Sequence, residues 1–113
     1  MSDILDQLTE ILEQRRRADS SDSYVASLHQ KGLNKILEKV GEEAVETIVA
    51  AKDCQVDPSE SARTQVIRET ADLWFHSMVM LSHLDLSARQ VLEELEKRFN
   101  ISGLVEKASR TNQ

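Results

Sequence analysis

The segment VIRETADLWFHSMVMLSHL, residues 66–84, decides the fold class of this chain. At about 100° per residue, its apolar side chains cover most of the circumference of a helix. They are Val66, Ile67, Leu73, Trp74, Phe75, Met78, Val79, Met80, Leu81 and Leu84. A helix that is apolar nearly all round is a buried helix. The segment therefore predicts a bundle in which other helices cover this one.

The rest of the chain shows helical rather than strand periodicity. Helices are expected at about residues 3–17, 24–30, 33–52, 58–84 and 87–98, with one further short turn after residue 99. Only three Gly and one Pro interrupt the 113 residues, and no window alternates with period two. We expect a single all-α domain over residues 1–113, built as a bundle of four to five helices.

Capping residues mark three of the expected helix starts. Ser23 is placed as the N-cap of the short helix, which ends near Gly32. Ser87 with Gln90 at N3 forms a capping-box pattern. The helix of residues 58–84 is expected to open with Asp57 at N-cap, Pro at N1 and Glu at N3.

Composition excludes several function classes. The formal net charge is −6, so no basic field attracts nucleic acid. The single Cys54 excludes an internal disulfide and fits a reducing cytoplasm. The N-terminus lacks the basic and apolar regions of a signal peptide, and the apolar run around His76 and His83 is too short to cross a bilayer. We expect a cytoplasmic chain without membrane or nucleic-acid partners.

Three glutamates crowd the segment KVGEEAVETIVAAK, residues 39–52. Like charges three or four apart on a helix repel by a few tenths of a kcal/mol. Glu43 and Glu46 are three residues apart, so both reach one point beside the helix, and Glu42 lies next to them. Glu46 has no basic residue three or four positions away. A salt bridge within its own helix therefore does not explain it.

A second acidic pair lies on the predicted buried helix. Glu69 and Asp72 share a narrow stripe with His76 and His83. Buried acids are costly unless they are paired or bind a metal. Arg68 is placed to pair with Asp72, whereas Glu69 has no such partner.

If the two helices pack antiparallel, the two acidic pairs face each other at approximately the same level. The four carboxylates are those of Glu43, Glu46, Glu69 and Asp72. Oxygen ligands of this kind suit a hard divalent cation such as Mg²⁺. Lys35 and Lys39 lie on a neighbouring line of the first helix, and ammonium groups beside a metal suggest a polyphosphate substrate.

A ferritin-like di-iron site requires Glu-x-x-His, and none of His29, His76 and His83 has a Glu three residues before it. We expect His76 and His83 to be hydrogen-bonded core or interface residues. Because one short chain cannot cover the apolar helix, we also expect a homodimer whose protomers complete the bundle.

The acidic residues carry a resemblance to a known family. GEEAVE (residues 41–46) and ETAD (residues 69–72) form the pattern E-E-x-x-E…E-x-x-D of the all-α, MazG-like nucleoside triphosphate pyrophosphohydrolases. The surrounding residues 23–52, 69–98 and 102–109 closely resemble phosphoribosyl-ATP pyrophosphohydrolase of histidine biosynthesis.

This resemblance implies Mg²⁺-dependent hydrolysis of phosphoribosyl-ATP to phosphoribosyl-AMP and pyrophosphate. It implies metal binding by Glu43, Glu46, Glu69 and Asp72, and a role for Glu42 as ligand of a second ion or in orienting water. It places near the phosphates or ribose Tyr24, Ser27, Lys31, Lys35 and Lys39. A cyclohydrolase on a separate chain would act next. The alternatives are a house-cleaning enzyme acting on dCTP, dUTP or damaged nucleotides, and a non-catalytic helical interaction module.

Overall fold

The computed structural model describes residues 2–100 and contains five helices in that range. They are α1 (Ser2–Arg16), α2 (Tyr24–Lys31), α3 (Leu33–Val56), α4 (Glu60–His83) and α5 (Ala88–Phe99). Residues 2–100 contain no strand, so the predicted all-α class is confirmed. The helical turn expected after residue 99 lies outside the described residues.

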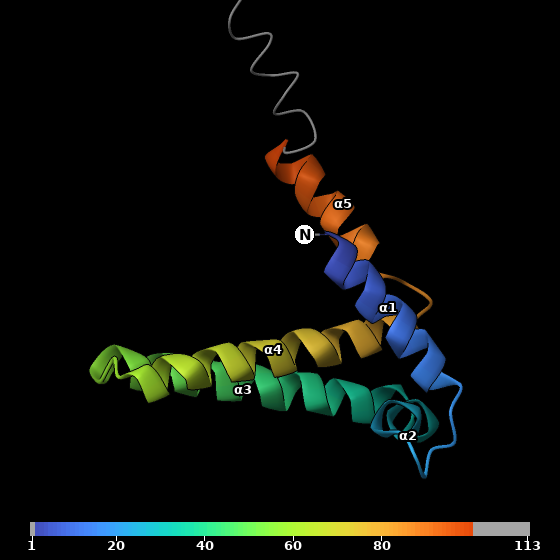
Figure 1. Cartoon of the computed structure of the whole chain (residues 1–113), viewed down its shortest axis with the longest axis horizontal. Coiled ribbons are helices and arrows are strands. Elements are labelled where there is room, and N and C mark those ends of the chain that lie inside the picture. The colour runs from blue at the N-terminus through green and yellow to red at the C-terminus, as the bar shows by residue number, and fades with distance from the viewer. Residues whose placement is uncertain (1, 101–113) are drawn as a thin grey trace, which may run out of the picture.

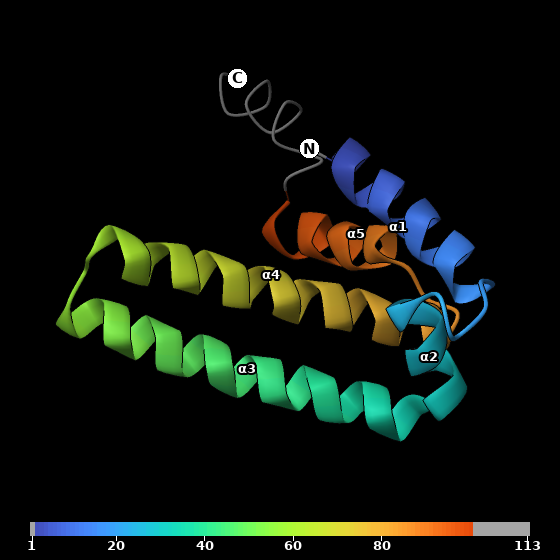
Figure 2. The same ribbon diagram turned by 60° about the horizontal axis from the view of Figure 1, so that its bottom comes forward.

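The two longest helices, α3 and α4, form an antiparallel hairpin (Figure 1). The short helix α2 packs at the end of the hairpin opposite its tight turn, and α1 and α5 lie over the same end of α4 (Figure 2). No helix within residues 2–100 is both long and apolar enough to cross a membrane.

The core lies where all five helices meet, at the α2 end of the hairpin. Its buried side chains are Leu12, Val25, Leu28, Ile36, Met78, Val79 and Ala88. Apolar side chains from α1, α2, α3, α4 and α5 thus share one cluster, as expected of a bundle. The core therefore holds α2 in place against the ends of α3 and α4.

The other half of the hairpin consists of only two helices, and its apolar side chains face outward. Val45 and Ile48 of α3 are 59% and 62% exposed, and Ile67 of α4 is 69% exposed. The sequence predicts a helix buried nearly all round, but a single chain buries only part of α4. This uncovered apolar surface lies on the helices that carry the acidic residues.

The start of α4 differs from the prediction. Ser59, not Asp57, is the N-cap: its Oγ accepts a hydrogen bond from the Ala62 amide at 3.1 Å. Asp57 instead ends α3, where its N–H donates to the Asp53 carbonyl. Pro58 disfavours a helical conformation at the residue before it, so Asp57 is extended, with φ −138° and ψ 89°. The helix α3 also continues four residues beyond the predicted end, to Val56.

The other predicted caps are confirmed. Ser23 Oγ accepts from the Ala26 amide, and Ser87 and Gln90 form a complete capping box. Gly32 joins α2 to α3 with a φ of +100°, a conformation that L-residues with a side chain rarely adopt. The bend at Gly32 sets the direction of α2 relative to the hairpin.

Candidate active site

The tight turn between α3 and α4 brings the two acidic pairs to the same level. Glu46 lies ten residues before the end of α3, and Glu69 lies nine residues after the start of α4. At 1.5 Å per residue, this difference is a small fraction of a helical turn. The two acidic pairs therefore lie at nearly the same level, because α3 ends later and α4 begins later than predicted.

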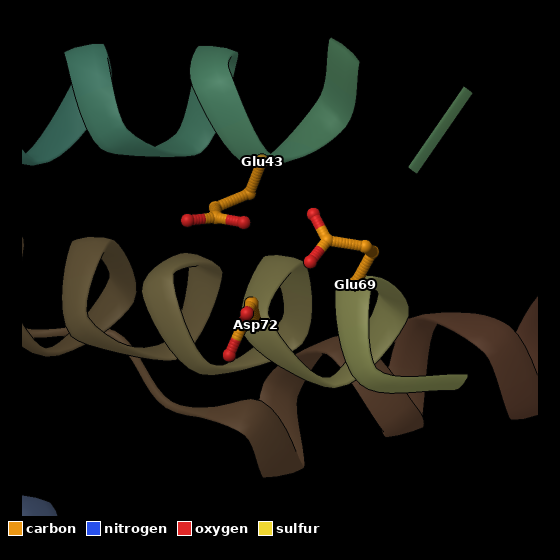
Figure 3. Close-up of side chains that lie close together, drawn as sticks. All are labelled: Glu43, Glu69 and Asp72. Atoms are coloured by element: carbon orange, nitrogen blue, oxygen red, sulfur yellow. The ribbon is translucent and has the colours of Figure 1, made fainter. Parts of the chain in front are cut away.

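Three of the predicted carboxylates converge between the helices (Figure 3). One oxygen each from Glu43, Glu69 and Asp72 lies within 4.8 Å of the others. Glu43 points from α3 toward α4 and is only 8% exposed, whereas Asp72 is exposed. Glu46 lies outside this group of three but is close enough to influence Glu43 and Glu69 electrostatically. The cluster is therefore buried on the α3 side and open on the Asp72 side.

Mutual repulsion shifts the protonation of these carboxylates. A shared hydrogen bond with Glu46 is the largest cause that raises the pKa of Glu69, to about 7, and desolvation follows. Burial is the largest cause that raises the pKa of Glu43, followed by the charge of Glu46. Like charges at short range disfavour ionisation. Without a cation, the cluster therefore retains a proton near neutral pH.

The donor set fits a hard divalent cation. All its ligand atoms are carboxylate oxygens, the type that Mg²⁺ prefers. Glu43 Oε2 is buried and has no hydrogen-bond partner among the described residues. A buried carboxylate oxygen without a partner carries a desolvation penalty, which a bound cation would offset. No ion pair to Arg68 or any other residue among 4–100 neutralises Asp72.

Two of the three lysines of α3, Lys35 and Lys39, form ion pairs along that helix. Lys39 Nζ lies 3.1 Å from Glu42 Oε2, and Lys35 Nζ lies 3.4 Å from Glu38 Oε2. These pairs are solvent-accessible, and such pairs contribute little stability, so the ammonium groups exchange partners at small cost. Glu42 is thus held beside Lys39, one residue before the buried Glu43.

The remaining predicted site residues lie on α2. Tyr24 is the first residue of the helix, and its hydroxyl is 2.9 Å from His76 Nε2. Ser27 Oγ donates to the Tyr24 carbonyl at 2.7 Å, so this hydroxyl is engaged within its own helix. Lys31 is exposed at the end of α2. The structure brings Tyr24, but not Lys31, into direct contact with α4.

His76 is confirmed as a hydrogen-bonded core residue, and it contacts the site. It is 5% exposed, and its Nδ1 donates to the Asp72 carbonyl at 2.8 Å. The position of His76 beside the site was indicated by the sequence, because Asp72 and His76 are four residues apart and share one stripe of the helix. The partner Tyr24 was not predicted, because it lies 52 positions away on another helix.

Two histidines, His29 of α2 and His83 of α4, lie side by side near the end of α4. The Nδ1 atoms of His29 and His83 are 2.9 Å apart, and the two rings stack with centroids 5.1 Å apart. Burial lowers the pKa of His29, as do the positive charge of Arg16 and the neighbouring His83. Arg16 also donates to the Ser82 carbonyl at 2.7 Å, so α1 covers this histidine pair.

Comparison with known protein families gives one match that spans the whole site. Residues 5–99 match a family model described as phosphoribosyl-ATP pyrophosphohydrolase. The match extends from α1 to the end of α5 and contains the four predicted metal ligands together with Lys35 and Lys39.

Proposed function

The chain belongs to the phosphoribosyl-ATP pyrophosphohydrolase family, and we propose that it hydrolyses its substrate by Mg²⁺-assisted attack of water on the triphosphate. The family activity is that of a hydrolase acting on phosphorus anhydrides, in histidine biosynthesis. One observation supports metal assistance above the others: Glu43, Glu69 and Asp72 converge around a buried carboxylate oxygen that has no partner. The proposed ligands are these three carboxylates together with Glu46.

The products define the bond that breaks. Water adds to phosphorus, the anhydride bond between the α- and β-phosphates breaks, and pyrophosphate leaves with the bonding electron pair. When bound, Mg²⁺ supplies neutralisation of the charge on the phosphate oxygens and the leaving group. Glu42 is proposed to orient the attacking water or to take up its proton, as a general base does. The ammonium of Lys39 lies 3.1 Å from the Glu42 carboxylate.

Substrate contacts are proposed on both sides of the acidic cluster. Lys35 and Lys39 lie on α3, and phosphate oxygens can replace their exposed carboxylate partners. Tyr24, Ser27 and Lys31 lie on α2 and are proposed to bind the ribose or phosphates. The substrate would thus span from the metal ligands toward α2.

We further propose that the protein acts as a cytoplasmic homodimer, with a separate cyclohydrolase chain using its product. The exposed apolar side chains of α3 and α4 support the dimer, because isolated soluble chains rarely leave such surfaces open. One chain has a mass of 12.8 kDa. Light scattering at micromolar concentration is expected to give twice this mass. A stable monomer would contradict the dimer without bearing on the reaction.

The function is tested by pyrophosphate release from a panel of nucleotides, measured with Mg²⁺ and with excess chelator. We expect release from phosphoribosyl-ATP that requires the metal. Faster release from dCTP, dUTP or oxidised nucleotides would instead indicate a house-cleaning enzyme. No release from any nucleotide would favour a non-catalytic helical module.

A further inference from the structure

The hydrogen bonds of His76 define which of its nitrogens carries a hydrogen. Its Nδ1 lies 2.8 Å from the carbonyl oxygen of Asp72, and a carbonyl can only accept. In the neutral ring, Nδ1 therefore holds the hydrogen and Nε2 is the acceptor. The Tyr24 hydroxyl, 2.9 Å from Nε2, must then donate its hydrogen to His76.

The ring of Tyr24 is held from two sides. Phe75 stacks against it, with centroids 6.2 Å apart and planes inclined by 22°. The ring of His76 meets it edge-on, with centroids 5.8 Å apart at 83°. With the ring fixed, rotation of the hydroxyl hydrogen is the freedom that remains, and the hydrogen bond to His76 removes it. Tyr24 is nevertheless half exposed, so a ligand can reach the residue from solvent.

The Tyr24 hydroxyl lies near the acidic cluster, through its bond to His76, and near Lys39. His76 is one helical turn beyond Asp72, and its Nδ1 bonds the Asp72 carbonyl at 2.8 Å, so the ring lies directly beside the acidic cluster. Tyr24 also contributes to the raised pKa of Lys39, after the hydrogen bond with Glu42. A substrate bound to the cluster and to Lys39 would therefore pass close to this hydroxyl.

We propose that His76 is a positioning residue that makes Tyr24 Oη a hydrogen-bond acceptor toward the substrate, and that Tyr24 therefore recognises a sugar hydroxyl rather than a phosphate. A phosphate oxygen at neutral pH has no hydrogen to donate, whereas a ribose hydroxyl does. With its own hydrogen committed to His76, the Tyr24 oxygen offers only lone pairs. This inference rests on the proposed function and specifies which part of the substrate Tyr24 binds.

The first test is the tautomer of His76, read from the imidazole ¹⁵N shifts of the full chain at pH 8. We expect a hydrogen on Nδ1 and none on Nε2. The opposite tautomer would overturn the inference. Because this measurement needs no turnover, it tests the inference even if the proposed reaction is wrong.

The second test is a double-mutant cycle with Tyr24→Phe, His76→Phe and both changes together, measured with phosphoribosyl-ATP. Each single change is expected to raise KM about 3- to 10-fold, the contribution of one neutral hydrogen bond, with kcat little changed. The double variant should match the single variants, because His76 acts through Tyr24. Ser77→Ala, next to His76 on the same helix, is the control and should leave KM unchanged.

Multiplicative effects in the double variant, or a loss confined to kcat, would contradict the positioning role. If His76→Phe fails to fold, Tyr24→Phe alone still tests recognition, because it removes only an oxygen from a half-exposed ring. An unchanged KM in Tyr24→Phe would overturn the inference. If the wild-type chain releases no pyrophosphate, the proposed function fails, and the tautomer measurement stands separately.

Discussion

The acidic cluster and the histidine pair both place like groups at close range, but they respond to the crowding in opposite ways. In the cluster, the pKa of Glu43 and that of Glu69 rise, so each carboxylate favours binding a positive ion or a proton. In the pair, the pKa of His29 falls, so the imidazole favours being neutral. The first arrangement thus favours a nearby positive charge, whereas the second disfavours one.

The neighbouring helices explain the difference. The cluster is open on its Asp72 side, and no cation from residues 4–100 neutralises that carboxylate. The histidine pair lies under α1, whose Arg16 already supplies a positive charge next to Ser82. A metal-ligand set is therefore recognised by uncompensated charge as well as by its ligand atoms. Two histidines with touching nitrogens do not meet this criterion here.

The largest expected effect is the loss of activity on neutralising the cluster. Glu46→Gln and Asp72→Asn are each expected to reduce pyrophosphate release more than about 100-fold, because removing even a group that supports a metal ligand costs about 10- to 100-fold. The fold, followed by circular dichroism, should be retained. Glu93→Gln on α5 is the matched control. If either cluster variant keeps a third of the wild-type rate, its carboxylate is not a ligand.

A smaller effect is expected on stability when the metal is added. Mg²⁺ at 100 times its Kd should stabilise the protein by about 2.7 kcal/mol, measured by thermal unfolding with and without chelator. Glu43→Gln should lose most of this gain, because it removes the buried ligand. His29→Phe should keep it in full. An equal loss in both variants would show that the two sites do not differ as described.

The smallest effect is expected in the pH dependence of stability without metal. Glu69 has a pKa of about 7 in the folded chain, so the folded state binds more protons than the unfolded state between about pH 4.5 and 7. Its contribution to stability is lost as pH rises through 7. The pKa of His29 is lowered from 6.5, so here the unfolded state binds more protons. Stability from His29 is lost as pH falls below 6.5.

Thermal unfolding of Glu69→Gln and His29→Phe between pH 5.5 and 8, with chelator, separates the contributions of the two groups to the pH dependence of stability. Glu69→Gln should reduce the loss of stability toward pH 8, and His29→Phe should reduce the loss toward pH 5.5. Parallel curves for both variants and the wild-type chain would mean that neither group titrates differently on folding.

Local sequence signals predicted the helices and the two acidic pairs. The contacts between residues of different helices depended on long-range packing. Ser23, Ser87 and the periodicity of α4 act within one or two turns, so the sequence shows them directly. The acidic pairs were predictable because each is three residues apart on one helix. Their convergence depended on the length of the α3–α4 turn, where Asp57 and Ser59 compete as caps.

The contacts of the histidines could not be predicted in the same way. His76 meets Tyr24, and His29 meets His83, across more than 50 positions and between different helices. Helical periodicity gives the face on which a side chain lies but not the angle at which two helices cross. That angle is set here by the bend at Gly32.

The angle of α2 depends on a backbone conformation at Gly32 that is strained for L-residues and favourable for D-residues. A Cβ added at this position would meet no atom within 4 Å, so space is not what excludes a side chain. The obstacle is φ of +100° with ψ of 174°, which is the mirror image of an ordinary extended conformation. A D-alanine introduced there by chemical synthesis would adopt it without strain, whereas L-alanine would not. The approach of Tyr24 to the site thus depends on one residue being achiral.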